Sequence, residues 1–193
     1  AGHIRETDPD LSADMYEMAR DLLSIAGFVH YEISNWAKPG RASNHNLTYW
    51  TNGPYLGVGP GAHSSLKKVR FSNTKSPRSY IANMNKPTPF NKCSPFLERL
   101  KICGSIDQIE HGSVKLEMSD TMILGLRLAG GVSIQRFTER FTVDPLKIYR
   151  NEIMQLAAVG LINVRQDSIH IPQDSWMISN EVFSRFITAE GTD

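Results

Sequence analysis

The sequence predicts an α/β fold that ends in a mainly helical, winged-helix-like module. An amphipathic helix, a glycine and a short strand follow one another between residues 11 and 33, and this succession is half of a βαβ unit. The last eighty residues place helices first, then a two-stranded hairpin and then a final helix, which is the order of a winged-helix-like module. With 40% hydrophobic and 21% charged residues, the 193-residue chain has the composition of an ordinary globular protein.

The first element is a helix over residues 11–26. Its apolar residues recur at the helical period and form one stripe: Leu11, Met15, Met18, Leu22 and Ile25. Asp10 is the expected N-cap and Gly27 the expected residue after the last turn. A strand follows over 28–33, and the other members of its sheet are expected upstream of this chain.

The middle of the chain is predicted to be less regular. Residues 34–54 are rich in Gly, Pro, Asn and Ser and are expected to form a loop. Strands are expected over 55–58 and 69–71, and Ser76 and Pro77 should start a short helix through Met84. Residues 85–112 are interpreted as a linker or insertion that holds one short helix around 97–103.

The C-terminal region is predicted to contain four helices and a hairpin. The helices are expected over 120–128, from the N-cap Ser133 through Phe141, from Pro145 through Ala158, and after a cap at Ser175 or Ser179. Strands at 161–164 and 168–171 should pair around Gln166 and Asp167. The last helix is expected to turn Val182, Phe183 and Phe186 inward.

The charges are unevenly distributed. No Asp or Glu occurs between Glu32 and Glu98, whereas that stretch carries nine bases: Lys38, Arg41, Lys67, Lys68, Arg70, Lys75, Arg78, Lys86 and Lys92. Such a basic block attracts anions, namely phosphates, nucleic acid or carboxylated small molecules. The alternative is a solvated surface that lacks acids by chance.

Several function classes are disfavoured. Cys93 and Cys103 cannot supply a disulfide framework and have no zinc-ligand spacing. No apolar run approaches the roughly 20 residues of a spanning helix, and the first residues do not resemble a signal peptide. We therefore expect a cytoplasmic protein without a membrane span.

The run Ser43-Asn44-His45-Asn46-Leu47-Thr48-Tyr49-Trp50 is the strongest local indication of chemistry. His45 offers a ring nitrogen that can bind haem iron, and Tyr49 and Trp50 offer flat faces that can stack on a macrocycle. Lys38 and Arg41 are candidates for pairing with the propionates. The alternative is structural: the two large rings anchor a loop on the core and His45 binds a backbone carbonyl.

Residues 57–62, GVGPGA, match the glycine spacing of dinucleotide-binding loops only superficially. Pro60 removes an N–H donor and no helical pattern follows, so a tight turn is expected there and His63 is taken as structural.

Three segments closely resemble the HemW haem-chaperone family of the radical S-adenosylmethionine (SAM) superfamily: YEISNWAKPG (31–40), HNLTYW (45–50) and YLGVGPGAH (55–63). Residues 122–128 and 179–183 are similar to the C-terminal domain of that family and of the related oxygen-independent coproporphyrinogen III oxidase, HemN. The resemblance runs from about residue 11 to 186 and excludes 85–117.

The resemblance implies a partial (β/α) barrel whose closing part is 1–84, a linker at 85–112, and a HemN-type winged-helix-like domain at 113–193. It also implies that His45 is the haem ligand, Asn46 its orienting neighbour, and Tyr49 and Trp50 the stacking faces. Ala37 and Ile123 match positions that contact SAM in the related oxidase.

The chain departs from this family in one respect. It lacks the C-x-x-x-C-x-x-C run whose thiolates hold the [4Fe–4S] cluster, so it supplies no cluster ligand and no catalytic residue is assigned. It is therefore expected to be either the second half of a longer protein or a protein without radical chemistry.

The expected function is the haem-binding part of a chaperone that passes haem to client proteins. The alternatives are a fragment of a coproporphyrinogen III oxidase-type enzyme and a winged-helix interaction module. Residues 133–193 hold six Arg or Lys and eight Asp or Glu, which disfavours binding to DNA.

Overall fold

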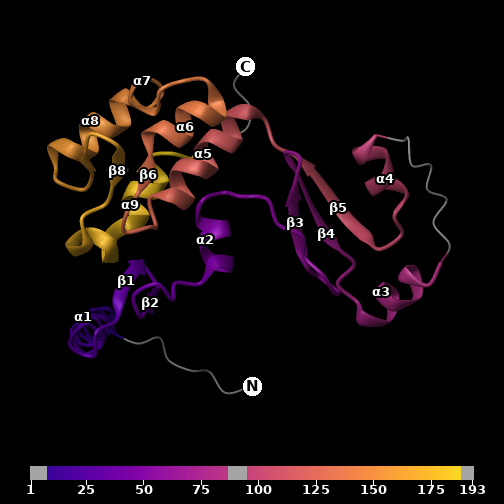
Figure 1. Cartoon of the computed structure of the whole chain (residues 1–193), viewed down its shortest axis with the longest axis horizontal. Coiled ribbons are helices and arrows are strands. Elements are labelled where there is room, and N and C mark those ends of the chain that lie inside the picture. The colour runs from indigo at the N-terminus through magenta and orange to yellow at the C-terminus, as the bar shows by residue number, and fades with distance from the viewer. Residues whose placement is uncertain (1–7, 87–94, 188–193) are drawn as a thin grey trace. The chain divides into compact units, whose positions relative to one another are not determined.

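The computed structural model describes residues 8–86 and 95–187, and its fold is α/β, as predicted (Figure 1). The chain forms two compact units. Unit 1 comprises Ala1–Thr51 together with Thr121–Asp193, and unit 2 comprises Asn52–Asp120. The expected domain limits at residues 84 and 113 stay a prediction.

Helix α1 (Pro9–Ile25) begins two residues earlier than predicted. The N-cap is Asp8, not Asp10, because the Asp8 carboxylate accepts the Asp10 N–H at 2.9 Å and Pro9 occupies the first helical position. After α1, Gly27 adopts a φ of +74°, as the prediction of a terminating glycine requires.

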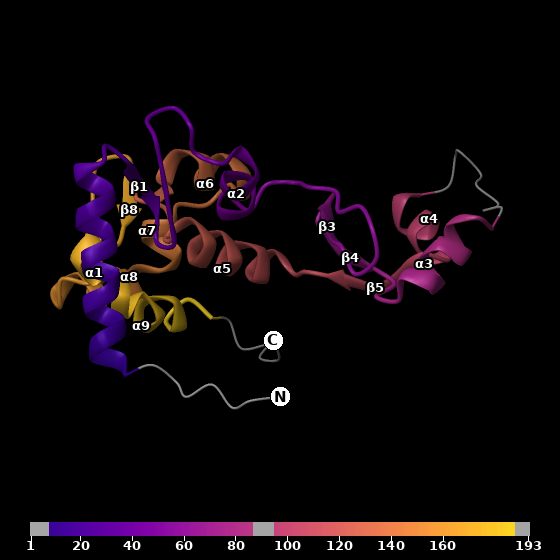
Figure 2. The same ribbon diagram turned by 90° about the horizontal axis from the view of Figure 1, so that it is seen from below.

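The apolar stripe of α1 is exposed. Its exposed fraction runs from 52% at Leu11 to 85% at Ile25, and α1 contains no buried residue. Figure 2 shows α1 along its length with β1 beside it. The helical period correctly predicted the helix, but no described element covers its apolar face.

The strand expected at 28–33 is β1 (Val29–Glu32), which pairs antiparallel with β2 (Asn35–Ala37). The prediction that 34–54 is a loop was wrong, since this stretch holds β2 and the helix α2 (Asn44–Trp50). The short polar turn after Glu32 returns the chain along β1, and Ser43 caps α2, with its hydroxyl accepting the Asn46 N–H at 3.3 Å.

The rest of unit 1 contains mostly helices around a small sheet. Along the chain come α5 (Val114–Gly125, which begins within the span of unit 2), β6 (Val132–Ser133), α6 (Ile134–Phe141), α7 (Pro145–Ile148), α8 (Arg150–Ala158), β7 (Asn163–Val164), β8 (Ser168–His170), the 3-10 helix η1 (Gln173–Ile178) and α9 (Ser179–Ser184). The three strands are antiparallel in the order β6-β8-β7. The predicted hairpin is therefore present, and the Ser133 hydroxyl caps α6 as expected.

Some predicted boundaries in this region were wrong. The helix expected over 120–128 starts at Val114 and ends at Gly125. The helix expected over 145–158 is two helices, because Tyr149 (φ −106°, ψ 30°) leaves the helical conformation. Neither Ser175 nor Ser179 makes a side-chain cap, as η1 leads directly into α9.

The core of unit 1 is made of residues that are at most 8% exposed. They include Met122, Leu126, Phe137, Ile169, Trp176, Val182, Phe183 and Phe186. The three inward residues predicted for the last helical region are thus confirmed. Gly131 (φ +71°) lets β6 approach β8, because a Cβ there would lie 2.1 Å from the Ile169 carbonyl oxygen.

Unit 2 is built on the antiparallel sheet β3 (His63–Leu66), β4 (Val69–Asn73) and β5 (Ile106–His111), with α3 (Pro77–Met84) and α4 (Phe96–Ile102). The core consists of Val69, Phe71 and Leu100, against which the partly buried Phe96 and Leu97 of α4 pack.

The strands of unit 2 were predicted only in part. The strand expected over 55–58 is a single bridge between Tyr55 and Ser65, and β3 was not predicted. Within residues 85–112, the short helix predicted around 97–103 is confirmed as α4. β5 was not predicted there, and its residues pair with β4 and complete the sheet. Residues 57–62 precede a strand rather than a helix, which agrees with the predicted turn.

No helix within the described residues is long and apolar enough to cross a membrane.

Candidate functional site: the α2 helix and the buried pair behind it

The HNLTYW segment is a helix, where the sequence indicated a loop. Within α2 the Thr48 hydroxyl donates to the Asn44 carbonyl at 2.9 Å, and the Thr51 hydroxyl after α2 donates to the Leu47 carbonyl at 2.7 Å. Helical spacing brings His45 beside Tyr49 and puts Asn46 one turn before Trp50. The helix therefore groups the four predicted residues into two pairs.

His45 and Tyr49 form the outer pair. Their ring centroids lie 4.7 Å apart at an interplanar angle of 87°, so the rings meet edge to face. His45 is exposed and Tyr49 is half-buried. The imidazole is thus accessible to a ligand, and its orientation is supported by the phenol ring.

Asn46 and Trp50 form the inner pair. The Asn46 side-chain amide donates to the hydroxyl of Tyr31 on β1 at 3.4 Å. The guanidinium carbon of Arg127 lies 4.4 Å from the centroid of the Trp50 ring. Asn46 therefore contacts the β1–β2 hairpin, and Trp50 contacts the turn after α5.

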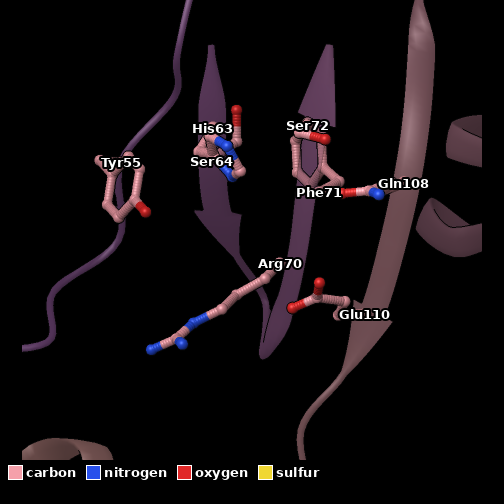
Figure 3. A pocket seen from close by; sticks show the side chains of 8 residues that line it. All are labelled: Tyr55, His63, Ser64, Arg70, Phe71, Ser72, Gln108 and Glu110. Atoms are coloured by element: carbon pink, nitrogen blue, oxygen red, sulfur yellow. The ribbon is translucent and has the colours of Figure 1, made fainter. Parts of the chain in front are cut away.

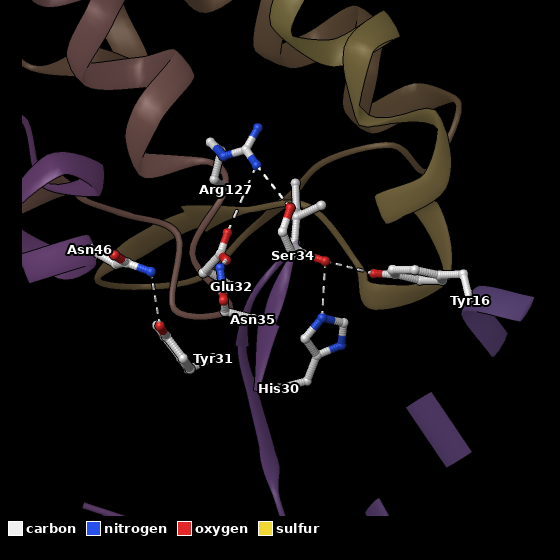
Figure 4. A network of polar contacts seen from close by, with 9 residues as sticks. Tyr16, His30, Tyr31, Glu32, Ser34, Asn35, Asn46 and Arg127 are labelled. Carbon is white, nitrogen blue, oxygen red and sulfur yellow. Dashed lines mark hydrogen bonds and ion pairs between the residues drawn. The ribbon is translucent and has the colours of Figure 1, made fainter. Parts of the chain in front are cut away.

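Behind α2 lies a buried carboxylate, Glu32, with an exposed fraction of zero (Figure 4). One Glu32 oxygen accepts a hydrogen bond from the Asn35 side-chain amide. The other lies 3.8 Å from Nη2 of Arg127, and this nitrogen also donates to the Ser34 hydroxyl at 3.3 Å. Arg127 therefore links Trp50 to the hairpin turn.

Sequence analysis assigned no role to Tyr31, Glu32 or Arg127. Glu32 and Arg127 are 95 positions apart, and charge, period and spacing do not relate residues at that separation. Both lie in segments that resemble the HemW family, and that resemblance was the only indication in the sequence.

Beside this pair, four rings pack in unit 1: Tyr16, His30, Trp36 and Trp176. His30 stacks on Trp36 with centroids 4.0 Å apart at 15°, and meets the Trp176 ring edge at 4.4 Å. The Tyr16 hydroxyl and His30 Nε2 both contact the Ile33 carbonyl oxygen, at 3.0 and 3.1 Å (Figure 4). Burial lowers the pKa of His30 below 6.5 and raises the pKa of Tyr16 above 10.0.

The two predicted propionate partners lie on the loop between β2 and α2. Lys38 Nζ donates to the Ala26 carbonyl and lies 4.5 Å from the centroid of the Phe28 ring. Arg41 is exposed, and its backbone N–H closes a turn onto the Lys38 carbonyl at 2.9 Å. Their role toward an anion stays a prediction.

The two positions aligned with SAM contacts are half-buried in unit 1. Ala37 ends β2, and Ile123 lies in α5. Their role toward SAM stays a prediction as well.

The basic block is divided between the two units. Unit 1 holds Lys38 and Arg41, unit 2 holds the bases from Lys67 through Lys86, and Lys92 lies outside the described residues.

Unit 2 has a pocket of about 200 Å³ on its sheet (Figure 3). Polar side chains dominate its lining: His63, Arg70, Ser72, Gln108 and Glu110. Arg70 also pairs with Asp120 at 2.8 Å, and burial raises the pKa of that carboxyl while Arg70 opposes the rise. The lining holds one basic residue, Arg70, and one acidic residue, Glu110, so the pocket does not favour one ligand charge.

Within residues 8–86 and 95–187, no three His, Cys, Asp or Glu side chains are grouped so that they could hold a metal ion. Cys93 lies outside the described residues, and the half-buried Cys103 thiol lies 3.2 Å from the Ser105 hydroxyl.

Comparison with known proteins shows which families the chain is similar to. Residues 114–178 match the HemN C-terminal domain family. The chain is 32% identical to the haem chaperone HemW of Lactococcus lactis over 186 residues, which are 96% of the chain and 45% of that protein. It is 43% identical to HemW of Haemophilus influenzae over 188 residues, 95% of the chain and 44% of that protein.

The fold is similar to that of coproporphyrinogen III oxidase (HemN) from Escherichia coli, a radical SAM enzyme. The TM-score is 0.65 at 13% sequence identity, over 94% of this chain and 42% of the enzyme. The chain spans less than half the length of each of these three proteins.

Proposed function

Since the chain belongs to the family of the haem chaperone HemW and carries a HemN C-terminal domain, we propose that it is the haem-binding part of a HemW-like chaperone. The proposed site is α2, with the outer pair His45 and Tyr49 and with the half-buried Trp50. Haem is the cargo in this proposal: it is bound, held and passed on without being chemically changed.

The observation that carries the proposal is the geometry of His45 and Tyr49. An exposed imidazole offers a ring nitrogen to iron, and a phenol ring one helical turn away holds that imidazole edge to face. We propose His45 as the axial ligand, with Tyr49 and Trp50 as aromatic contacts for the porphyrin and Asn46 as the neighbour that orients α2. Lys38 and Arg41 are proposed to attract the propionates.

Passing haem to a client protein requires that the site be reachable from solution. The exposure of His45 supports such a transfer, and we propose that it takes place in the cytoplasm.

SAM and a [4Fe–4S] cluster belong to the radical SAM superfamily, and the residues present do not fit the cluster. The 193 residues contain no C-x-x-x-C-x-x-C run, and the described ones contain no group suited to a metal. The chain's own part would be limited to contacts of Ala37 and Ile123 with SAM, and we assign no catalytic step to it.

We also propose a winged-helix-like architecture for residues 113–193. The succession α5, β6, α6, α7–α8, β7 and β8, with β8 central in the sheet, supports it. For residues 1–84 we propose the closing part of a partial (β/α) barrel in a longer protein. The exposed stripe of α1 and the 45% coverage of the Lactococcus relative support this view.

The alternative function, a fragment of a coproporphyrinogen III oxidase-type enzyme, is supported by the similarity of fold to HemN. The presence of the HNLTYW segment, which resembles the HemW family, favours the chaperone. If the chain is part of an oxidase-type enzyme instead, the substitution His45→Ala should leave its affinity for haemin unchanged.

The test is a titration of the chain with haemin, followed by its Soret absorption. We expect a ligation-dependent Soret shift for the unaltered chain and at least about a tenfold loss of affinity for His45→Ala. His63→Ala is the matched control, because His63 is also exposed but lies on β3 outside α2. Equal spectra and affinities for the unaltered chain and His45→Ala would reject the assignment.

A further inference from the structure

We propose that Arg127 is a positioning residue of the haem site. Its guanidinium fixes the plane of the Trp50 ring, and the buried carboxylate of Glu32 holds that guanidinium in place. This inference rests on the proposed function, because it explains how one of the aromatic contacts for the porphyrin is held. It assigns Arg127 no direct contact with haem.

The first step is the orientation of Trp50. Its indole Nε1 is buried and has no hydrogen-bond partner among the described residues. A buried indole is ordinarily oriented by an acceptor for this N–H. Here the ring has to be oriented by contacts to its faces and edges, and the guanidinium of Arg127 lies 4.4 Å from its centroid.

The second step is the charge of Arg127. A carboxylate with zero exposure is destabilising unless an opposite charge or strong donors compensate it. Glu32 has one oxygen bound by Asn35, while its second oxygen, Oε2, has no hydrogen bond within the described residues. The ion pair with Arg127 Nη2 at 3.8 Å compensates that oxygen and draws the guanidinium toward the hairpin.

The third step is the backbone that carries Arg127. The Ile33 N–H donates to the Arg127 carbonyl at 3.1 Å, and the Ala129 N–H donates to the Tyr31 carbonyl at 3.0 Å. The turn after α5 is thereby attached to β1 and to the turn that follows β1. The Tyr31 hydroxyl also accepts from Asn46 (Figure 4). Helix α2 is therefore linked to β1 through Asn46 and to Arg127 through Trp50.

A guanidinium suits this position better than an ammonium. It is planar, stays charged at any physiological pH and can stack on an aromatic ring while its edge binds a carboxylate and a hydroxyl. The Arg127 guanidinium lies over the Trp50 ring, forms the ion pair with Glu32 and donates to the Ser34 hydroxyl. Lysine would keep the charge but lose the planar contact.

The first measurement needs no haem. In a ¹⁵N-resolved NMR spectrum of the full chain, the indole N–H signal of Trp50 is identified by its loss in Trp50→Phe. We expect Arg127→Met to shift this signal and to raise its hydrogen-exchange rate at least about tenfold, because the ring is released. Arg127→Lys should have a smaller effect in the same direction.

The second measurement is a double-mutant cycle for haemin affinity with Arg127→Met and Trp50→Leu. If Arg127 acts through Trp50, each single variant loses affinity and the double variant loses no more than Trp50→Leu alone. Arg136→Met is the control, since Arg136 is exposed on α6 outside these contacts, and it should leave both measurements unchanged.

The outcomes separate this inference from the proposed function. An unmoved Trp50 signal in both Arg127 variants, or strictly additive losses in the cycle, would overturn the positioning role. If the unaltered chain binds haemin without dependence on His45, the proposed function fails, and the NMR measurement still decides whether Arg127 orients Trp50. Should Arg127→Met fail to fold, Arg127→Lys decides, and an unshifted Trp50 signal in that variant overturns the inference.

Discussion

Two methionines of unit 1 show how differently two helices with apolar residues are used. Met18 belongs to the regular apolar stripe of α1 and is 65% exposed, whereas Met122 of α5 is completely buried. The stripe of α1 is the more regular of the two in sequence. Helical period therefore indicates that a face is apolar, but it does not indicate whether this chain supplies the surface that covers that face.

Two polar residues of the β1–β2 hairpin are buried, in contrast to the exposed apolar residues of α1. Glu32 is charged and fully buried, and His30 is 9% exposed, although neither lies in an apolar pattern. Both are buried where the β1–β2 hairpin meets residues of the C-terminal part of unit 1, at Arg127 and Trp176. Four substitutions or conditions test this contrast.

Met122→Ala should produce the largest effect. Truncating a completely buried methionine removes apolar burial and leaves a cavity, so we expect a loss of about 3 kcal/mol in the free energy of unfolding. Urea denaturation followed by far-UV circular dichroism measures it. A loss below about 1 kcal/mol would mean that the core around α5 collapses or is less tightly packed than described.

Glu32→Ala tests the ion pair between the β1–β2 hairpin and Arg127. Removal of the carboxylate leaves the partly buried guanidinium without its counter-charge, and we expect a loss of about 2 kcal/mol in unfolding free energy. Glu17→Ala, at an exposed position of α1, is the control and should change little. Equal stability of the two variants would show that the buried pair is energetically neutral.

Lowering the pH should weaken unit 1 through His30. Its folded pKa lies below 6.5 because of burial, so the unfolded state binds the proton more readily. The contribution of neutral His30 to the free energy of unfolding is therefore fully present above pH 6.5. It is lost as the pH falls from 6.5 toward the lower pKa of His30 in the folded state. His170, whose pKa is also lowered by burial, acts in the same direction.

The measurement for His30 is the urea midpoint at several pH values between 7.5 and 5, using His30→Gln as the comparison. The variant should show a shallower decline than the unaltered chain, since one of the two buried imidazoles is gone. Parallel curves would contradict the assignment of this pH dependence to His30.

Met18→Ala should have the smallest effect, less than about 0.5 kcal/mol, because the side chain is already mostly in water. It is the same substitution as Met122→Ala, so the two unfolding curves compare directly. A loss as large as that of Met122→Ala would show that the α1 stripe is covered in solution, and sedimentation at several concentrations would then reveal whether a second copy covers it.

Local signals predicted most of the elements whose information is local. The N-cap Ser133, the glycine after α1 and the proline that starts α3 act through residues within one turn of them, and each was identified correctly. The prediction failed for β3 and β5, which are stabilised by pairing with β4 and carry no regular alternation of their own. It also failed for α2, where polar residues suggested a loop.

The candidate site divides in the same way. His45, Asn46, Tyr49 and Trp50 were proposed as site residues because they are close together in the chain and because the resemblance to HemW segments implies a role toward haem. Their grouping into an exposed pair and a pair held from behind was not predicted, because it depends on α2 being helical and on Tyr31 and Arg127 lying against it.

By itself, the sequence determined the α/β class, several caps and turns, and the resemblance to the HemW family. These follow from backbone preferences and side-chain chemistry that act over a few neighbours. Only the tertiary structure decided that the stripe of α1 is exposed, that Glu32 is buried and that Arg127 lies over Trp50. Those features depend on contacts between residues many positions apart, and a linear pattern does not encode which distant residue will supply the other half of a contact.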